Sequence, residues 1–211
     1  MRLRKCIQDY KSAKQDASTL TARAKTTIEK LTPNWEVLIS ASAYALVEDF
    51  GTDVAEAMGG FTFDPTRQAV RTWLKKHAAE NVKTILSTQK DAMGKLISKG
   101  VEDNLSTTQI AKSVRTFYDG NSKYLAMRVA RSEVATASGF ASQEAAEQSG
   151  VAKKKTWLSS RDSRVRDSHL AIDGETVPLG ELFSNGMEYP GDQRGDPAES
   201  INCRCVLTFH S

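Results

Sequence analysis

The chain has 211 residues, of which 39% are hydrophobic and 26% are charged, and its formal net charge is +3. These values fit one globular domain or two unequal ones, and the charge is too small to indicate a nucleic-acid-binding protein on its own. The opening sequence lacks the apolar segment of a signal peptide, and no apolar run approaches the roughly 20 residues of a membrane helix, so we expect no membrane contact. The three cysteines, Cys6, Cys203 and Cys205, are too few for a disulfide framework and favour a reducing compartment.

The first 150 residues have the apolar spacing of α-helices. Start signals such as Pro33 and Asp64-Pro65, and terminal glycines such as Gly100 and Gly150, divide this stretch. We predict helices over about residues 2–30, 33–50, 65–77, 82–99, 107–119 and 122–148. The first of them has a thin apolar stripe, so we expect it to pack on a partner or on a second copy of the chain.

After Gly150 the pattern changes to strands and turns. We predict a strand over residues 151–158, a hairpin turn at Asp173-Gly174, a turn-rich loop, and a last strand over residues 201–209. The predicted fold class is therefore α+β, with a mostly helical N-terminal part and a small mixed α/β, loop-rich C-terminal domain.

The last predicted strand carries a pair of cysteines. Side chains alternate along a strand, so Cys203 and Cys205 would share one face and Arg204 would lie on the other. Residues two apart in a strand lie about 6.6 Å from each other with parallel side chains, which disfavours a disulfide. Two interpretations stay open. The thiols are small core residues, or they bind a metal such as zinc together with His169 and a fourth ligand from Asp162, His210 or water.

A cluster of polar residues precedes this strand in the sequence. If residues 164–171 form a short helix, Arg166 and His169 lie three apart on one face, and Asp162 is placed to cap the helix. With Arg164, these groups could carry acid–base chemistry, bind phosphate, or form a buried polar network that fixes a small domain. We expect the network, because no nucleophile with a paired base is evident.

Basic residues gather just before and within this cluster. They stand ahead of an acidic stretch, so they form either a solvated surface or a contact to the phosphate backbone of DNA. The candidates for DNA contact are Lys153, Lys154, Lys155 and Arg161.

Several segments, taken in order, carry a family resemblance. They are residues 130–133 (ARSE) late in a helix, Gly150-Val151, residues 155–157 (KTW), residues 162–169 (DSRVRDSH), Asp173-Gly174, and residues 197–205 (PAESINCRC). Together they resemble the phage Mu F-like minor head proteins, also called the phage head morphogenesis family. The likeness covers about the C-terminal half of the chain, and the order of the motifs is more specific than any one of them.

This resemblance implies a non-enzymatic minor head protein of a tailed phage or prophage. Such a protein is made in the bacterial cytoplasm, ends in the virion, lies at the portal vertex, and acts in head morphogenesis and in genome packaging or delivery. The implied partners are portal or major capsid protein and packaged DNA, and no cofactor is expected. The implied structural network consists of Arg131, Glu133, Asp162, Arg164, Arg166, His169, Cys203, Arg204 and Cys205.

The resemblance also suggests a division into domains. Residues 121–211 would be the Mu F-like domain, made of the long helix over residues 122–148 and a small mixed unit over residues 151–211. Residues 1–120 would be a helical scaffold that binds partners and could form a homo-oligomer. Arg131 and Glu133 point in different directions on the long helix, so we expect one of them to face the small mixed unit.

Two functions of other classes compete with the head protein. One is a small effector enzyme, a nuclease or transferase toxin that uses His169 with Arg166 and Asp162. The other is a zinc-stabilised binding module without a role in a phage.

Overall fold

A computed structural model describes residues 40–103, 105 and 107–211. The predicted helix over residues 2–30 and Cys6 lie outside the described residues. Within the described part, residues 79–124 form one compact unit, here called the helical unit. Residues 40–78 and 125–211 form the second, here called the mixed unit. The division between the compact units therefore differs from the boundary predicted at residue 120, because residues 40–78 cluster with the C-terminal residues.

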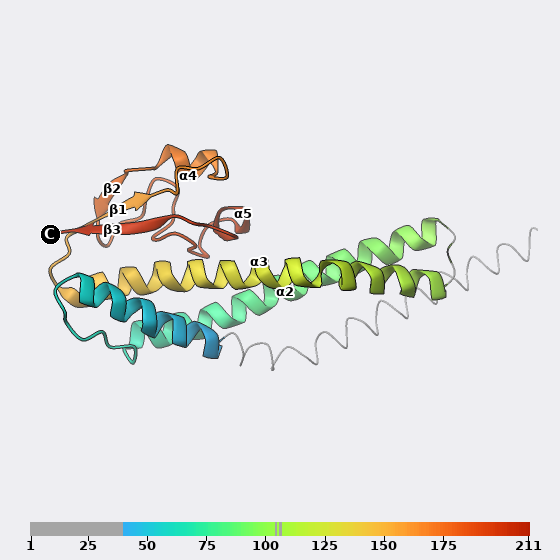
Figure 1. The fold of residues 1–211 in the computed structure, drawn as a ribbon, viewed down its shortest axis with the longest axis horizontal. Coiled ribbons are helices and arrows are strands. Elements are labelled where there is room, and N and C mark those ends of the chain that lie inside the picture. Colours follow the sequence, from blue (N-terminus) through green and yellow to red (C-terminus); the bar gives the residue numbers. More distant parts are fainter. Residues whose placement is uncertain (1–39, 104, 106) are drawn as a thin grey trace, which may run out of the picture. The chain divides into compact units, whose positions relative to one another are not determined.

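Two long helices each contain residues of both units, and both helices are longer than predicted. Helix α2 covers Gln68–Glu102 and helix α3 covers Thr107–Ser149 (Figure 1). The separate helices predicted on either side of residue 80 are one helix, and so are those on either side of Gly120. An isolated glycine in a helix costs only about 1 kcal/mol relative to alanine, so Gly120 does not interrupt α3. A further helix spans residues 40–57. No helix among the described residues combines the length and the apolar character needed to cross a membrane.

The mixed unit contains a small antiparallel sheet. Its strands are β1 (Lys154–Leu158), β2 (Thr176–Pro178) and β3 (Val206–His210), in the order β2-β1-β3. Thr156 of β1 pairs with Thr176 on one side and with Thr208 on the other. Two short helices, α4 (Asp167–Ala171) and α5 (Pro197–Ser200), precede β2 and β3. The predicted α+β fold class is confirmed.

Three strand predictions need correction. The segment 201–205 is not part of the last strand, because Asn202 adopts a left-handed backbone conformation (φ 56°) that an extended strand does not contain. The first strand begins at Lys154 and not at residue 151. Asp173-Gly174 does form a turn, with Gly174 at φ 84°, but the strand that pairs with β2 is β1, and α4 lies between them in the chain.

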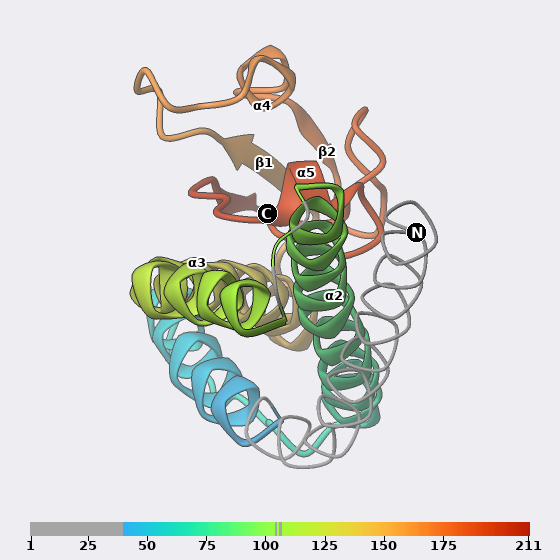
Figure 2. The same ribbon diagram turned by 90° about the vertical axis from the view of Figure 1, so that its right-hand side faces the viewer.

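Within the mixed unit, the C-terminal half of α3 is the middle layer. The sheet lies on one side of it, and the helix over residues 40–57 lies on the other (Figures 1 and 2). Small residues of α3, Ala137, Ala141 and Ala145, are fully buried in the core between these layers. A second core cluster lies within residues 151–211, here called the small C-terminal part. It is formed by Trp157, Ile172, Phe183, Met187 and Cys203.

Candidate functional site

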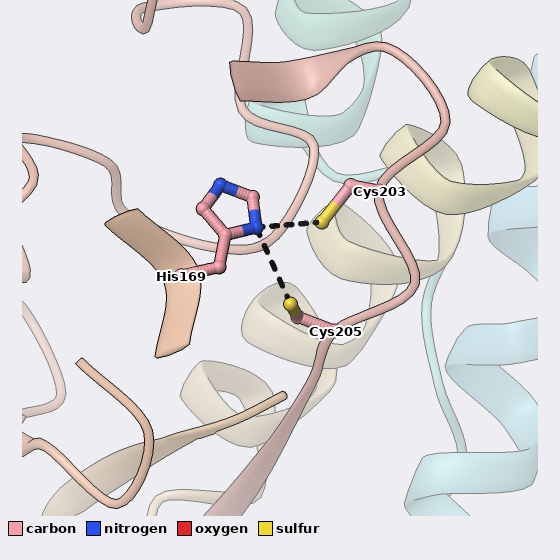
Figure 3. Close-up of side chains that lie close together, drawn as sticks. All are labelled: His169, Cys203 and Cys205. Atoms are coloured by element: carbon pink, nitrogen blue, oxygen red, sulfur yellow. Dashed lines mark hydrogen bonds between the residues drawn. The ribbon is translucent and has the colours of Figure 1, made fainter. Parts of the chain in front are cut away.

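Three side chains converge in the C-terminal part of the mixed unit (Figure 3). His169 comes from α4, and Cys203 and Cys205 come from the segment between α5 and β3. Nδ1 of the imidazole lies 3.7 Å from Sγ of Cys203 and 3.4 Å from Sγ of Cys205. His169 is 1% exposed and Cys203 is 4% exposed, whereas Cys205 is half-buried. Both cysteines are free thiols, so the three residues named as metal candidates from the sequence do lie together.

A turn after α5 brings the two sulfur atoms to the same point. Asp196 caps α5 by accepting a hydrogen bond from the backbone N–H of Ala198 at 2.8 Å. The helix ends within one turn, and the left-handed Asn202 reverses the chain direction. Because Cys203 and Cys205 are not in a strand, their side chains converge on the imidazole, and the predicted parallel arrangement is wrong.

The far side of the imidazole faces a carboxylate. Nε2 of His169 lies 2.9 Å from Oε2 of Glu199, and the hydroxyl of Ser168 donates a hydrogen bond to the same oxygen at 2.7 Å. The opposite ring nitrogen, Nδ1, points toward the two sulfur atoms.

Trp157 closes the site on the side of the sheet. It is fully buried on β1 and meets the His169 ring edge-to-face, with ring centroids 5.2 Å apart. Its indole N–H has no hydrogen bond of ordinary geometry to a described residue. The indole nevertheless lowers the pKa of the Cys205 thiol and so favours its thiolate form. The backbone N–H of Ser160 likewise lowers the pKa of the Cys205 thiol.

The protonation states of the two thiols depend on each other. A hydrogen bond from the Cys205 side chain lowers the pKa of Cys203, and His169 lowers this pKa further. The interaction with Cys203, together with burial, raises the pKa of Cys205. The thiolate is thus favoured at Cys203, and a thiolate is the form in which cysteine binds metals or attacks electrophiles.

An ion pair and a hydrogen bond join the segment before α4 to the segment before β3. Arg204 binds both carboxylate oxygens of Asp162, and this contact holds the pKa of the Asp162 carboxyl well below its usual range. The guanidinium of Arg166 donates a hydrogen bond to the backbone carbonyl of Ile201. The structure therefore brings Asp162, Arg166 and Arg204 together around the thiols.

Two details of the predicted polar cluster differ. Asp162 does not cap α4, because this helix begins at Asp167 and Arg166 occupies the cap position without a side-chain capping bond. Asp162 instead accepts a hydrogen bond from the backbone N–H of Arg164 at 2.9 Å. The guanidinium of Arg164 is exposed and lies 3.8 Å from Asp162, so it stays at the surface.

A contact from α3 to residues 151–211 is made by Ser132, which lies between Arg131 and Glu133. Arg131 is exposed, and Oε2 of Glu133 lies 2.7 Å from Nε2 of the buried His77 on α2. The intervening Ser132 makes the contact, since its hydroxyl accepts a hydrogen bond from the backbone N–H of Asn202 at 3.0 Å. This bond fixes the turn that precedes Cys203.

The basic candidates for DNA contact separate into two groups. Lys153 and Lys154 are exposed, and Arg161 is exposed but bound to Asp173 at 2.7 Å. Lys155 is fully buried, and its ammonium group donates hydrogen bonds to Gln143 Oε1 at 3.2 Å and to a backbone carbonyl at 2.8 Å. Lys155 therefore cannot contact DNA, and its prediction as a DNA contact is wrong.

The buried ammonium group predicts a pH dependence of stability. Burial lowers the pKa of Lys155 to about 8, whereas an unfolded lysine has a pKa near 10.4. Between pH 8 and 10 the unfolded chain binds the proton that the folded chain has released, so this group makes the free energy of unfolding rise with pH. We expect a rise of about 2 kcal/mol. Urea unfolding should show this rise in the free energy of unfolding between pH 8 and 10 for the native protein, and the rise should be absent from Lys155→Met.

Lys154→Met is the matched control, because Lys154 is the exposed neighbour in the same strand. It should keep the slope of the native protein. The same slope in Lys155→Met would contradict the assignment.

Several residues of the site were not predicted to act there. Glu199 stands in the acidic stretch that follows the basic residues, and Ser132 stands within the ARSE segment, so the sequence alone gives neither a role in the site. The capping signal Asp196-Pro197 could have placed Glu199 in the first turn of a short helix. No comparable signal exists for Ser132 or for the indole of Trp157, because their roles depend on contacts between residues distant in sequence.

Chemically, the site is a cluster of one imidazole and two thiols, of which the imidazole and the Cys203 thiol are buried. The family model described as Phage Mu protein F like protein matches residues 91–208. The match includes all of α3 and all three cluster residues. No curated protein and no solved structure matches the chain.

Proposed function

Because this chain belongs to the family of Phage Mu protein F like proteins, we propose that it is a minor head protein of a tailed phage or prophage. The family as a whole points to head morphogenesis. The finer proposal is that the protein acts at the portal vertex, in head assembly and in genome packaging or delivery. The observation that carries this proposal is the family match, which covers more than half of the chain.

The mixed unit has the features of a rigid adaptor. Its sheet, the C-terminal half of α3 and the helix over residues 40–57 form packed layers. Polar contacts such as the Arg204–Asp162 ion pair join the segment before β3 to the segment before α4. A protein held this way can present a fixed surface to portal or capsid protein. The exposed Lys153 and Lys154 supply a basic edge for packaged DNA, and a contact of that kind would weaken with rising salt.

The burial of His169 supports a structural role over an enzymatic one. A general base must reach the proton of its substrate within about 2.6–3.2 Å or through one water molecule. Here the imidazole is 1% exposed, with one nitrogen facing Glu199 and the other facing two thiols. The observations favour a network that fixes the fold, and they give the effector enzyme no specific support.

Complementation between lysates tests the head role. A phage with a stop codon early in this gene should produce normal tails and defective heads. Its lysate should therefore restore infectivity when it is mixed with a lysate that lacks a tail protein, and it should restore none when it is mixed with a lysate that lacks the portal protein.

The controls are the tail-gene and portal-gene null lysates, each incubated alone. Supplying the native gene from a plasmid should restore the titre of the null phage. Rescue of the portal-null lysate, or an unchanged titre of the null phage, would contradict the proposal.

A further inference from the structure

We propose that His169, Cys203 and Cys205 bind one zinc ion. The ligand atoms are Nδ1 of His169 and the Sγ atoms of the two cysteines, and all three lie within 4.8 Å of one another. Among the described residues, these three form the group that could hold a metal ion. Zinc binding would be a property of the fold, and it stands independently of the role in the phage head.

The distances between the ligand atoms fit a tetrahedral zinc ion. Zinc binds thiolate at about 2.3 Å and imidazole nitrogen at about 2.0–2.1 Å. Two such ligands at a tetrahedral angle are separated by about 3.5–3.6 Å. The two nitrogen–sulfur distances are 3.7 and 3.4 Å, on either side of this value. The nitrogen–sulfur spacing therefore suits one zinc ion shared by the imidazole and the thiols.

The surroundings of the ligands also match those of zinc sites. A histidine that binds a metal through one ring nitrogen usually donates the other N–H to a carboxylate, which fixes the ring and raises its basicity. Here Glu199 lies 2.9 Å from Nε2, at ion-pair distance but without the geometry of a hydrogen bond, and Ser168 donates a hydrogen bond to the same carboxylate. On another side, the fully buried Trp157 meets the imidazole edge-to-face, with ring centroids 5.2 Å apart, and shields the cluster from solvent. Both sides of the cluster are arranged for a bound cation.

The set of donor atoms selects the class of metal. Two thiolates and one imidazole are soft to borderline ligands, which favour zinc over magnesium, calcium and manganese. Three protein ligands leave a fourth position, and a water molecule completes the tetrahedron. The thiols would lose their protons on binding, and these protons would pass to solvent.

Zinc at this position would join two segments that are distant in the sequence. His169 belongs to a five-residue helix, and the cysteines belong to an irregular segment between α5 and β3. A single ion would fix both to each other and to Trp157 of β1. The competing arrangement is one buried and one half-buried thiol without a metal.

The first test is the metal content of the full chain. The protein is produced without a polyhistidine tag, because such a tag binds zinc itself, and it is purified with a reducing agent and zinc. Elemental analysis should find one zinc ion per chain. His169→Gln, Cys203→Ser and Cys205→Ser should each lose this zinc.

Matched controls separate the site from incidental binding. His210→Gln replaces an exposed histidine of β3, and Cys6→Ser replaces the third cysteine of the chain, so both should keep one zinc ion. A native chain without zinc after this treatment would overturn the proposal. Zinc that stays in a Cys203→Ser/Cys205→Ser double variant would overturn it as well.

A second measurement needs no variant and therefore survives any failure of a variant to fold. Cobalt(II) replaces zinc in tetrahedral thiolate sites and makes them visible. The native chain loaded with cobalt should show thiolate-to-metal charge-transfer absorption and intense d–d bands, and zinc should abolish both. Spectra of octahedral cobalt with oxygen ligands would contradict thiolate binding.

Removal of zinc with a chelator should lower the Tm by roughly 10 °C, and an unchanged Tm would contradict a zinc ion that holds the fold.

Discussion

Replacing Trp157 by alanine should lower the free energy of unfolding by about 3–5 kcal/mol, the cost of removing a large aromatic side chain from a core. Trp157 is fully buried and meets two rings edge-to-face, with ring centroids 5.2 Å from His169 and 5.3 Å from Phe183. Its loss would leave a cavity beside the thiols as well as remove apolar contact. Chemical denaturation followed by circular dichroism measures the change.

Val206→Ala is the control for this substitution. Val206 is in the neighbouring strand β3, pairs with Leu158 of β1, and is 57% exposed. Its truncation should change the free energy of unfolding by no more than about 0.5 kcal/mol. If both variants lost the same stability, Trp157 would not be the centre of the C-terminal core.

Replacing Gly139 by alanine should cost about 2–3 kcal/mol, although alanine is the better helix former. A Cβ atom at Gly139 would lie 2.2 Å from the backbone oxygen of Pro190 and 3.0 Å from the ring of Tyr189. The loop cannot withdraw easily, because the hydroxyl of Thr136 on α3 donates a hydrogen bond to the carbonyl of Gly191 at 3.0 Å. The Tm from calorimetry should therefore fall.

Gly120→Ala is the matched control in the same helix. No atom lies within 4 Å of a Cβ placed at Gly120, so alanine there should raise the free energy of unfolding by up to about 1 kcal/mol. The opposite signs of the two changes are the prediction. A gain of stability in both variants would show that α3 does not approach the loop at Gly139.

The fold class could be predicted from sequence because apolar periodicity and turn residues are local signals. The helical spacing of residues 122–148 and the turn at Asp173-Gly174 both appear in the structure. The lengths of α2 and α3 were not predicted, because a single glycine is a weak helix breaker and packing overrides its preference. The limits of the last strand failed for a different reason, since Asn202 takes a left-handed conformation that few residues adopt.

The candidate site was predicted in its members but not in its geometry. His169, Cys203 and Cys205 could be named because their side chains carry distinctive chemistry. Their convergence follows from a turn, and no periodicity in the sequence encodes it. Lys155 shows the opposite failure: a lysine in a basic run normally faces solvent, but here its side chain is buried and donates a hydrogen bond to Oε1 of Gln143 on α3.

Quantitative mass spectrometry of purified heads tests the central claim most directly. DNA-filled heads and proheads are separated from free protein by density-gradient sedimentation, and peptides of this chain are counted relative to portal and major capsid peptides. The account predicts that the chain co-sediments with heads at a constant, low ratio to the portal protein. Its absence from both proheads and filled heads, with the chain present in the soluble fraction, would contradict the assignment as a head protein.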